Sequence, residues 1–208
     1  MKYASLGISV VDLDTGEEVF SYDSQRALSP ASSMKVITTS TGLMLLGADF
    51  KFKTEIQYDG NISEDGILDG NIYIKGFGDP SLGSAKPEGT LTYQGISKLF
   101  AEKIKEKGIK EIKGKIIGDE SYYQSPPLPA SWQWEDLGNY YGAGVSALNM
   151  NANTYFISFQ QKTSLNTIPK VVNIQPHLPN INIQNEVKTA ARGTGDNCYI
   201  FGSPYINT

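Results

Sequence analysis

Residues 30–39 read Pro30-Ala31-Ser32-Ser33-Met34-Lys35-Val36-Ile37-Thr38-Thr39 and contain one Ser-x-x-Lys, from Ser32 to Lys35. Pro30 suits the first position of a helix, where its missing N–H is not needed. Residues three apart share a helix face, so the hydroxyl and the amine can point at the same place. A serine hydroxyl is a weak nucleophile until a base takes its proton, and an uncharged lysine can be that base. The spacing therefore predicts a nucleophile at Ser32 and its base at Lys35, near the positive end of a helix.

A Ser-x-x-Lys pattern is short, and average composition gives about one chance match in a chain of this size. Its meaning therefore depends on the rest of the sequence. The 208 residues correspond to one large domain or parts of two, and 39% hydrophobic residues are enough for a core. A net charge of -4 argues against a nucleic-acid partner, because phosphate binding needs clustered lysine and arginine.

Cysteine and histidine are too scarce for several kinds of site. With one cysteine, Cys198, and one histidine, His177, neither an intramolecular disulfide nor a structural zinc site is expected. A Ser-His-Asp triad would have to use His177, which sits in a proline-bracketed loop that offers no support for it. The sequence suggests no metal and no cofactor.

Hydrophobic periodicity predicts several strands and two helices. A helix begins near Pro30 and ends at Gly47, and we expect it to be buried because small polar residues share most of its faces. An amphipathic helix covers residues 92–107. Trp132 and Trp134 could stack on a sugar, but we expect them to anchor a loop on a core. The expected strands lie at residues 6–13, 19–22, 50–58, 67–75 with a break at Asp69-Gly70, 111–119, 154–160, 168–175, 181–190 and 197–202.

Several longer blocks resemble one family, the D-alanyl-D-alanine carboxypeptidases of the penicillin-binding protein 4 type, or class C low-molecular-mass penicillin-binding proteins. Two of the blocks, the one with Gly78-Asp79-Pro80 and the one at residues 141–149, are fairly specific to that family. The matching blocks are residues 11–16 (Val-Asp-Leu-Asp-Thr-Gly), 30–35, 70–82 with Gly78-Asp79-Pro80, 108–110, 118–120, 132–137, and 141–149 (Tyr-Gly-Ala-Gly-Val-Ser-Ala-Leu-Asn).

The resemblance implies an α+β fold in which a penicillin-recognising, β-lactamase-like transpeptidase domain is interrupted by inserted domains. Residues 1–49 would begin the transpeptidase domain, and residues 50–208 would form mostly β inserted domains with one or two helices. The implied activity is removal of the terminal D-Ala from peptidoglycan stem peptides, sometimes with endopeptidase cleavage. Ser32 matches the acylated nucleophile, its backbone N–H would be half of the oxyanion hole, and Lys35 matches the proton acceptor. β-Lactams would acylate the same serine, outside the cytoplasmic membrane.

The sequence departs from the family in two motifs. The family also needs Ser-x-Asn and Lys-Thr-Gly. Ser164-Leu165-Asn166 reads as a hairpin tip, and Lys188-Thr189-Ala190 lacks the glycine, so we reject both. We expect the missing motifs beyond residue 208. The ends, Met1-Lys2-Tyr3-Ala4 and Tyr205-Ile206-Asn207-Thr208, look like those of a piece of a longer protein without its secretory signal.

Without those motifs the 208 residues are expected to be inactive. A free lysine has a pKa of about 10.4 and is protonated at neutral pH, and burial or a second cation is what makes such an amine a base. Two other functions stay open. One is a non-catalytic module that binds or scaffolds cell-wall peptides, and the other is a different Ser-x-x-Lys hydrolase such as an esterase or β-lactamase relative, against which the long stretch after the first helix argues.

Overall fold

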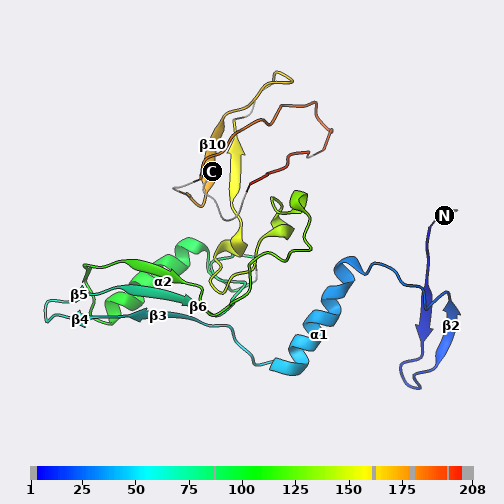
Figure 1. The fold of residues 1–208 in the computed structure, drawn as a ribbon, viewed down its shortest axis with the longest axis horizontal. Helices are drawn as coiled ribbons and strands as arrows, with labels where there is room; N and C mark the ends of the chain where they lie inside the picture. Colours follow the sequence, from blue (N-terminus) through cyan, green and yellow to red (C-terminus); the bar gives the residue numbers. More distant parts are fainter. Residues whose placement is uncertain (1–3, 87, 161–162, 179–180, 196, 203–208) are drawn as a thin grey trace. The chain divides into compact units, whose positions relative to one another are not determined.

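The computed structural model describes residues 4–86, 88–160, 163–178, 181–195 and 197–202 (Figure 1). Of the chain ends on which the expectation of a longer protein rests, residues 1–3 and 205–208 lie outside these ranges. The chain divides into two compact units, Met1–Lys51 and Phe52–Thr208. Helices and several small sheets occur together, which confirms the expected α+β class. Assignment of residues 1–49 and 50–208 to particular domains stays a prediction.

The first unit begins with an antiparallel hairpin of β1 (Ile8–Val11) and β2 (Glu18–Tyr22), in which Val10 pairs with Phe20. Asp12 shapes its turn by accepting the backbone N–H groups of Asp14 and Thr15, both at 2.9 Å. These two bonds hold the pKa of the Asp12 carboxyl below its usual range, and the bond from Thr15 has the larger effect. The Asp-Thr-Gly turn of the sequence is therefore a side-chain-stabilised turn.

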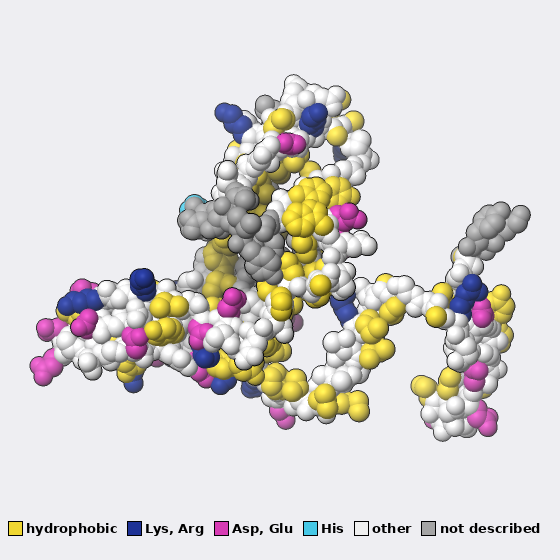
Figure 2. All heavy atoms as spheres, viewed as in Figure 1, with side chains coloured by type: hydrophobic (Ala, Val, Ile, Leu, Met, Phe, Trp, Pro, Cys, Tyr) yellow, Lys and Arg dark blue, Asp and Glu magenta, His cyan; other side chains and the backbone are white. Residues whose placement is uncertain are grey.

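A short 3-10 turn, Ala31–Ser33, leads into helix α1, Met34–Leu46, which ends at Gly47 with φ +82°. The expectation of a buried helix is not met within the described residues, since α1 has no buried side chain and Met44 is 84% exposed. Figure 2 shows hydrophobic side chains at the surface of this helix. Its small polar residues instead bond its own backbone: Thr39 Oγ1 donates to the Lys35 carbonyl over 2.7 Å.

Three segments of the second unit each contribute a strand to two different sheets. Among the described residues, β3 (Thr54–Tyr58), β6 (Ile72–Gly76) and β8 (Ile116–Asp119) form one sheet. The strands β4 (Asn61–Ile62), β5 (Ile67–Asp69) and β7 (Glu111–Ile112) form the other. In the first sheet, β3 is antiparallel to the central strand β6 and β8 is parallel to it. In the second, β4 is antiparallel to the central strand β5 and β7 is parallel to it.

Glycines mark the points where these segments pass from one sheet to the other. Gly60 separates β3 from β4, Gly70 separates β5 from β6, and Gly114 separates β7 from β8. A Cβ on Gly70 would overlap the Asp59 carbonyl oxygen, and one on Gly114 would overlap the Gly70 carbonyl oxygen. The single strand expected over residues 111–119 is therefore wrong, because the close approach of backbones at Gly114 divides it into two.

The core of the second unit lies between these strands and helix α2, Tyr93–Glu106. Leu68, Ile72 and Ile109 are almost fully buried, and Ile104 of α2 packs against them. The helix lies along the strands (Figure 1). Its start matches the sequence expectation, because Thr92 accepts the N–H of Gly95 at 3.2 Å as an N-cap.

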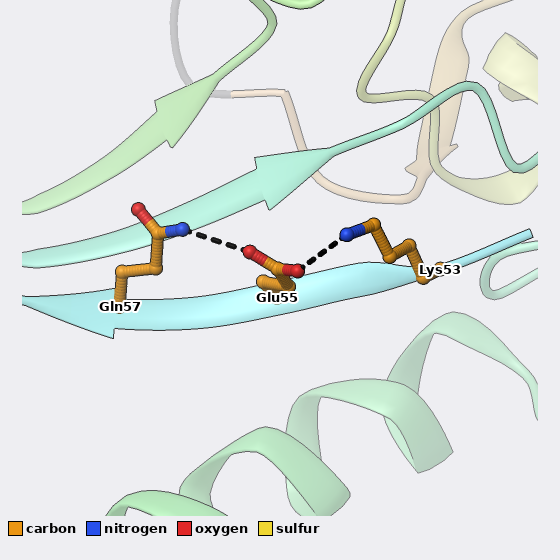
Figure 3. A network of polar contacts seen from close by, with 3 residues as sticks. All are labelled: Lys53, Glu55 and Gln57. Carbon is orange, nitrogen blue, oxygen red and sulfur yellow. Dashed lines mark hydrogen bonds and ion pairs between the residues drawn. The ribbon is translucent and has the colours of Figure 1, made fainter.

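On one face of β3, polar side chains form a row. Lys53 Nζ lies 2.7 Å from Glu55 Oε1, and Gln57 Nε2 donates to Glu55 Oε2 over 2.8 Å (Figure 3). Residues two apart on a strand point to the same side, which explains the row. The bond from Lys53 is the main reason that the pKa of the Glu55 carboxyl is lowered.

The rest of the unit has less regular structure. Short 3-10 turns cover Trp134–Asp136, Tyr140–Gly142 and Asn151–Asn153. Strands β9 (Phe156–Phe159) and β10 (Val171–Gln175) pair as an antiparallel hairpin.

Two expectations for this region are wrong. Trp132 and Trp134 are 37% and 56% exposed, so neither is an anchor in a core. Residues 181–190 and 197–202 contain no strand. The first of these segments bonds residues 166–169 in part through side chains, such as Asn185 Nδ2 to the Pro169 carbonyl at 2.6 Å, in place of a regular ladder.

Candidate active site

Ser32 and Lys35 meet where the 3-10 turn joins α1. Ser32 lies inside the turn Ala31–Ser33, and Lys35 is the second residue of the helix. The Nζ of Lys35 donates to the Oγ of Ser32 over 3.0 Å. A 3-10 turn brings residues three apart almost into line, which favours this contact. The structure therefore brings the two sequence-predicted site residues within hydrogen-bond distance.

The turn itself is fixed from Pro30. The Ser33 backbone N–H donates to the Pro30 carbonyl over 3.0 Å, and the Ser33 hydroxyl donates to the same oxygen. Pro30 is the residue that precedes the turn, with φ -73°, so the expectation that it is the first helical residue is off by one. Ser33 was not singled out from the sequence, where nothing distinguishes it from Ser32 except the spacing to Lys35.

The two neighbouring serines have different partners, and this difference bears on their chemistry. The Ser33 hydroxyl proton is used in the bond to Pro30, whereas the Ser32 oxygen accepts from Lys35. When the lysine amine is uncharged, the same contact allows it to take the Ser32 proton. Both side chains are exposed, so solvent and a substrate can reach them within the first unit.

The two motif-like segments of the second unit bond to each other. Thr189 Oγ1 donates to the Ser164 carbonyl over 2.6 Å, and the Asn166 N–H donates to the Thr189 carbonyl over 2.9 Å. Ser164 and Asn166 lie in the connection between β9 and β10, as expected for a hairpin tip. Their polar groups thus serve a local pairing of two loop segments.

Over the described ranges, no three His, Cys, Asp or Glu side chains are grouped so that they could hold a metal ion. In the same residues, every helix is too short or too polar to cross a membrane.

Comparison with known proteins identifies the family to which this chain belongs. Residues 1–200 match the D-Ala-D-Ala carboxypeptidase 3 (S13) family. The chain belongs to this family, as the blocks quoted from the sequence indicated.

Individual relatives agree with this assignment. The chain is 33% identical over 144 residues to a D-alanyl-D-alanine carboxypeptidase of Actinomadura sp. (strain R39), covering 69% of this chain and 25% of that protein. It is 25% identical over 197 residues to the D-alanyl-D-alanine carboxypeptidase DacB of Haemophilus influenzae, covering 95% of this chain and 38% of that protein. The crystal structure of penicillin-binding protein 4 from H. influenzae superposes with a TM-score of 0.68 at 28% identity, over 86% of this chain and 36% of the other. The chain therefore spans about a quarter to two fifths of the length of these relatives.

Proposed function

We propose that the protein is a serine-type D-Ala-D-Ala carboxypeptidase that acts on peptidoglycan stem peptides. The observation that carries this proposal is the 3.0 Å contact between Lys35 Nζ and Ser32 Oγ at the start of α1. Membership of the S13 family supports the reaction class. The substrate puts the site of action in the periplasm or elsewhere outside the cytoplasmic membrane.

The proposed reaction has two steps. Lys35 takes the Ser32 proton while Oγ bonds to the carbonyl carbon of the penultimate D-Ala, and the peptide bond to the terminal D-Ala breaks after its nitrogen gains a proton. Water then attacks the resulting ester and releases the shortened peptide and the free Ser32 hydroxyl. A β-lactam enters the first step in the same way, because its strained ring amide opens on Ser32.

The reaction needs groups that supplement this pair. A preorganised donor for the oxyanion is worth about 10²–10³ in rate, and an exposed amine is a poor base at neutral pH. In this proposal residues 1–208 alone carry the nucleophile but turn over no substrate.

Release of D-alanine from an acylated D-Ala-D-Ala peptide tests the proposal. The full-length protein should release D-alanine, and Ser32→Ala should reduce the rate by about 10³-fold or more while circular dichroism stays unchanged. Residues 1–208 alone should give none. If the full-length wild type binds stem peptides but releases no D-alanine, the protein is instead the non-catalytic module.

A further inference from the structure

A hollow of about 180 Å³ lies in the second unit, between the start of α2 and the foot of the β9–β10 hairpin. Neither Ser32 nor Lys35 is among the residues that line it. Two small residues and six larger ones line it, and none of the eight carries a charge. The larger ones are Thr92, Tyr93, Gln94, Asn151, Phe156 and Gln175.

One wall of the hollow is built on an unusual backbone. Asn151, Ala152 and Asn153 have φ values of 56°, 54° and 52°, a left-handed conformation that L-residues rarely adopt in succession. Bonds from outside the turn hold it, since the Asn151 N–H donates to the Leu82 carbonyl and Asn153 Nδ2 donates to the Gly144 carbonyl, both over 2.9 Å. The fold therefore maintains a strained segment beside this hollow.

The polar groups of the walls are oriented by bonds that leave part of their capacity for a ligand. Gln175 Nε2 donates to the Tyr93 hydroxyl over 3.3 Å, so the phenol proton itself is not used in that bond. Asn151 Nδ2 donates to the Thr154 carbonyl over 2.8 Å, which leaves the amide oxygen as an acceptor. The hollow thus offers a donor and acceptors at fixed positions.

An aromatic ring completes the site. Phe156 lines the hollow and is 64% exposed, so its ring can meet a ligand that enters from solvent. Ring faces pack against apolar surfaces, and the C–H face of a pyranose is such a surface.

We infer that this hollow binds an N-acetylated sugar of the glycan strand, with the ring against Phe156 and the acetamido group among the amides of Gln94, Asn151 and Gln175. Neutral walls suit a neutral ligand, because burying an unpaired charge is costly. Stem peptides carry carboxylates and amines, for which this hollow has no counter-charge. Its volume is below the range of about 300–1,000 Å³ for drug-sized ligands, so it takes one ring-sized group. The inference rests on the proposed action on peptidoglycan and gives the second unit a role in binding the glycan part of that substrate.

Binding of chitotetraose, an oligomer of N-acetylglucosamine, to the full-length protein tests the inference by calorimetry or NMR titration. We expect saturable binding that weakens about tenfold in Phe156→Ala and in Gln94→Ala, both of which replace exposed side chains. Tyr199→Ala and Gln184→Ala remove an exposed aromatic and an exposed amide outside the hollow and should leave binding unchanged. Cellotetraose, which lacks acetamido groups, should bind about tenfold more weakly.

The inference is overturned if binding shows no saturation by about 10 mM chitotetraose, if cellotetraose binds equally well, or if the control variants lose as much binding. The inference is also overturned if a sugar-free stem peptide shifts the NMR signals of the residues that line the hollow, because the ligand would then be a peptide and not the glycan. Penicillin labelling of the same variants separates this failure from that of the proposed function. Labelling without sugar binding refutes the glycan site alone, and sugar binding without labelling refutes the acyl-transfer function alone.

Discussion

The Asp59 carboxylate accepts the backbone N–H of Asn71 over 2.5 Å at the line where three strand segments change sheets. Asp59 also accepts the Tyr73 hydroxyl over 2.7 Å, and Asn71 Oδ1 accepts the Lys115 N–H over 3.0 Å. One side-chain network therefore joins the segments that contain β3, β6 and β8. The arrangement of the two sheets depends on this network, because all three segments must bend at the place where it lies.

Replacement of Asp59 by asparagine tests the network through its pH dependence. The bond from the Asn71 N–H, followed by that from Tyr73, holds the pKa of the Asp59 carboxyl below its usual value. Asp59 therefore contributes stability that is present above the unfolded value of about 3.9 and is lost as the pH falls through the lower folded value. Asp59→Asn should lower the melting temperature at pH 7, and the difference from wild type should shrink as the pH falls below 4. A difference of the same size at every pH would contradict the role given to the charge.

Substitution of Gly70 by alanine tests the close approach of the segments. The new Cβ would overlap the Asp59 carbonyl oxygen, which is backbone and cannot easily move. Such overpacking costs about 1–3 kcal/mol, measurable by urea unfolding. Gly202→Ala is the matched control, since its Cβ would meet nothing within 4 Å. Equal stability of the two variants would show that the sheets bend without this contact.

Removal of the Thr92 hydroxyl tests the start of α2. Thr92→Ala leaves the Gly95 N–H without its cap and should lower the free energy of unfolding by about 1 kcal/mol. Ser97→Ala removes a hydroxyl that bonds the Tyr93 carbonyl on the exposed side of the same helix, and it should change stability by less than about 0.5 kcal/mol. Loss of more stability in Ser97→Ala than in Thr92→Ala would argue against the cap.

Local signals in the sequence predicted much of the fold. Apolar periodicity predicted α2 over residues 92–107, and the strand patterns at residues 6–13 and 19–22 predicted the two strands of the first hairpin. The division of residues 111–119 into two strands could not be seen, because it arises from contacts of Gly114 with a segment more than forty residues earlier. The strand expected over residues 181–190 was wrong for a similar reason. Alternation of apolar and polar residues shows that a segment could lie in a sheet, but not that a neighbouring strand is present to pair with it.

The serine–lysine contact was predictable because it depends on residues three apart in one turn. The exposure of α1 and of Trp134 was not, since it depends on which segments pack against them. The hollow beside Asn151 was also beyond sequence reasoning, because its lining comes from four separate stretches of the chain. Nothing in those stretches resembles a short motif.

Acylation of the full-length protein by a fluorescent penicillin, mapped to a residue by mass spectrometry, tests the central claim most directly. We expect one adduct, on Ser32, that is absent from Ser32→Ala and retained in Ser33→Ala, because the Ser33 hydroxyl donates to Pro30 and has no lysine partner at the 3.0 Å contact. Labelling of Ser32→Ala at the wild-type level, or an adduct on any other residue, would contradict the account.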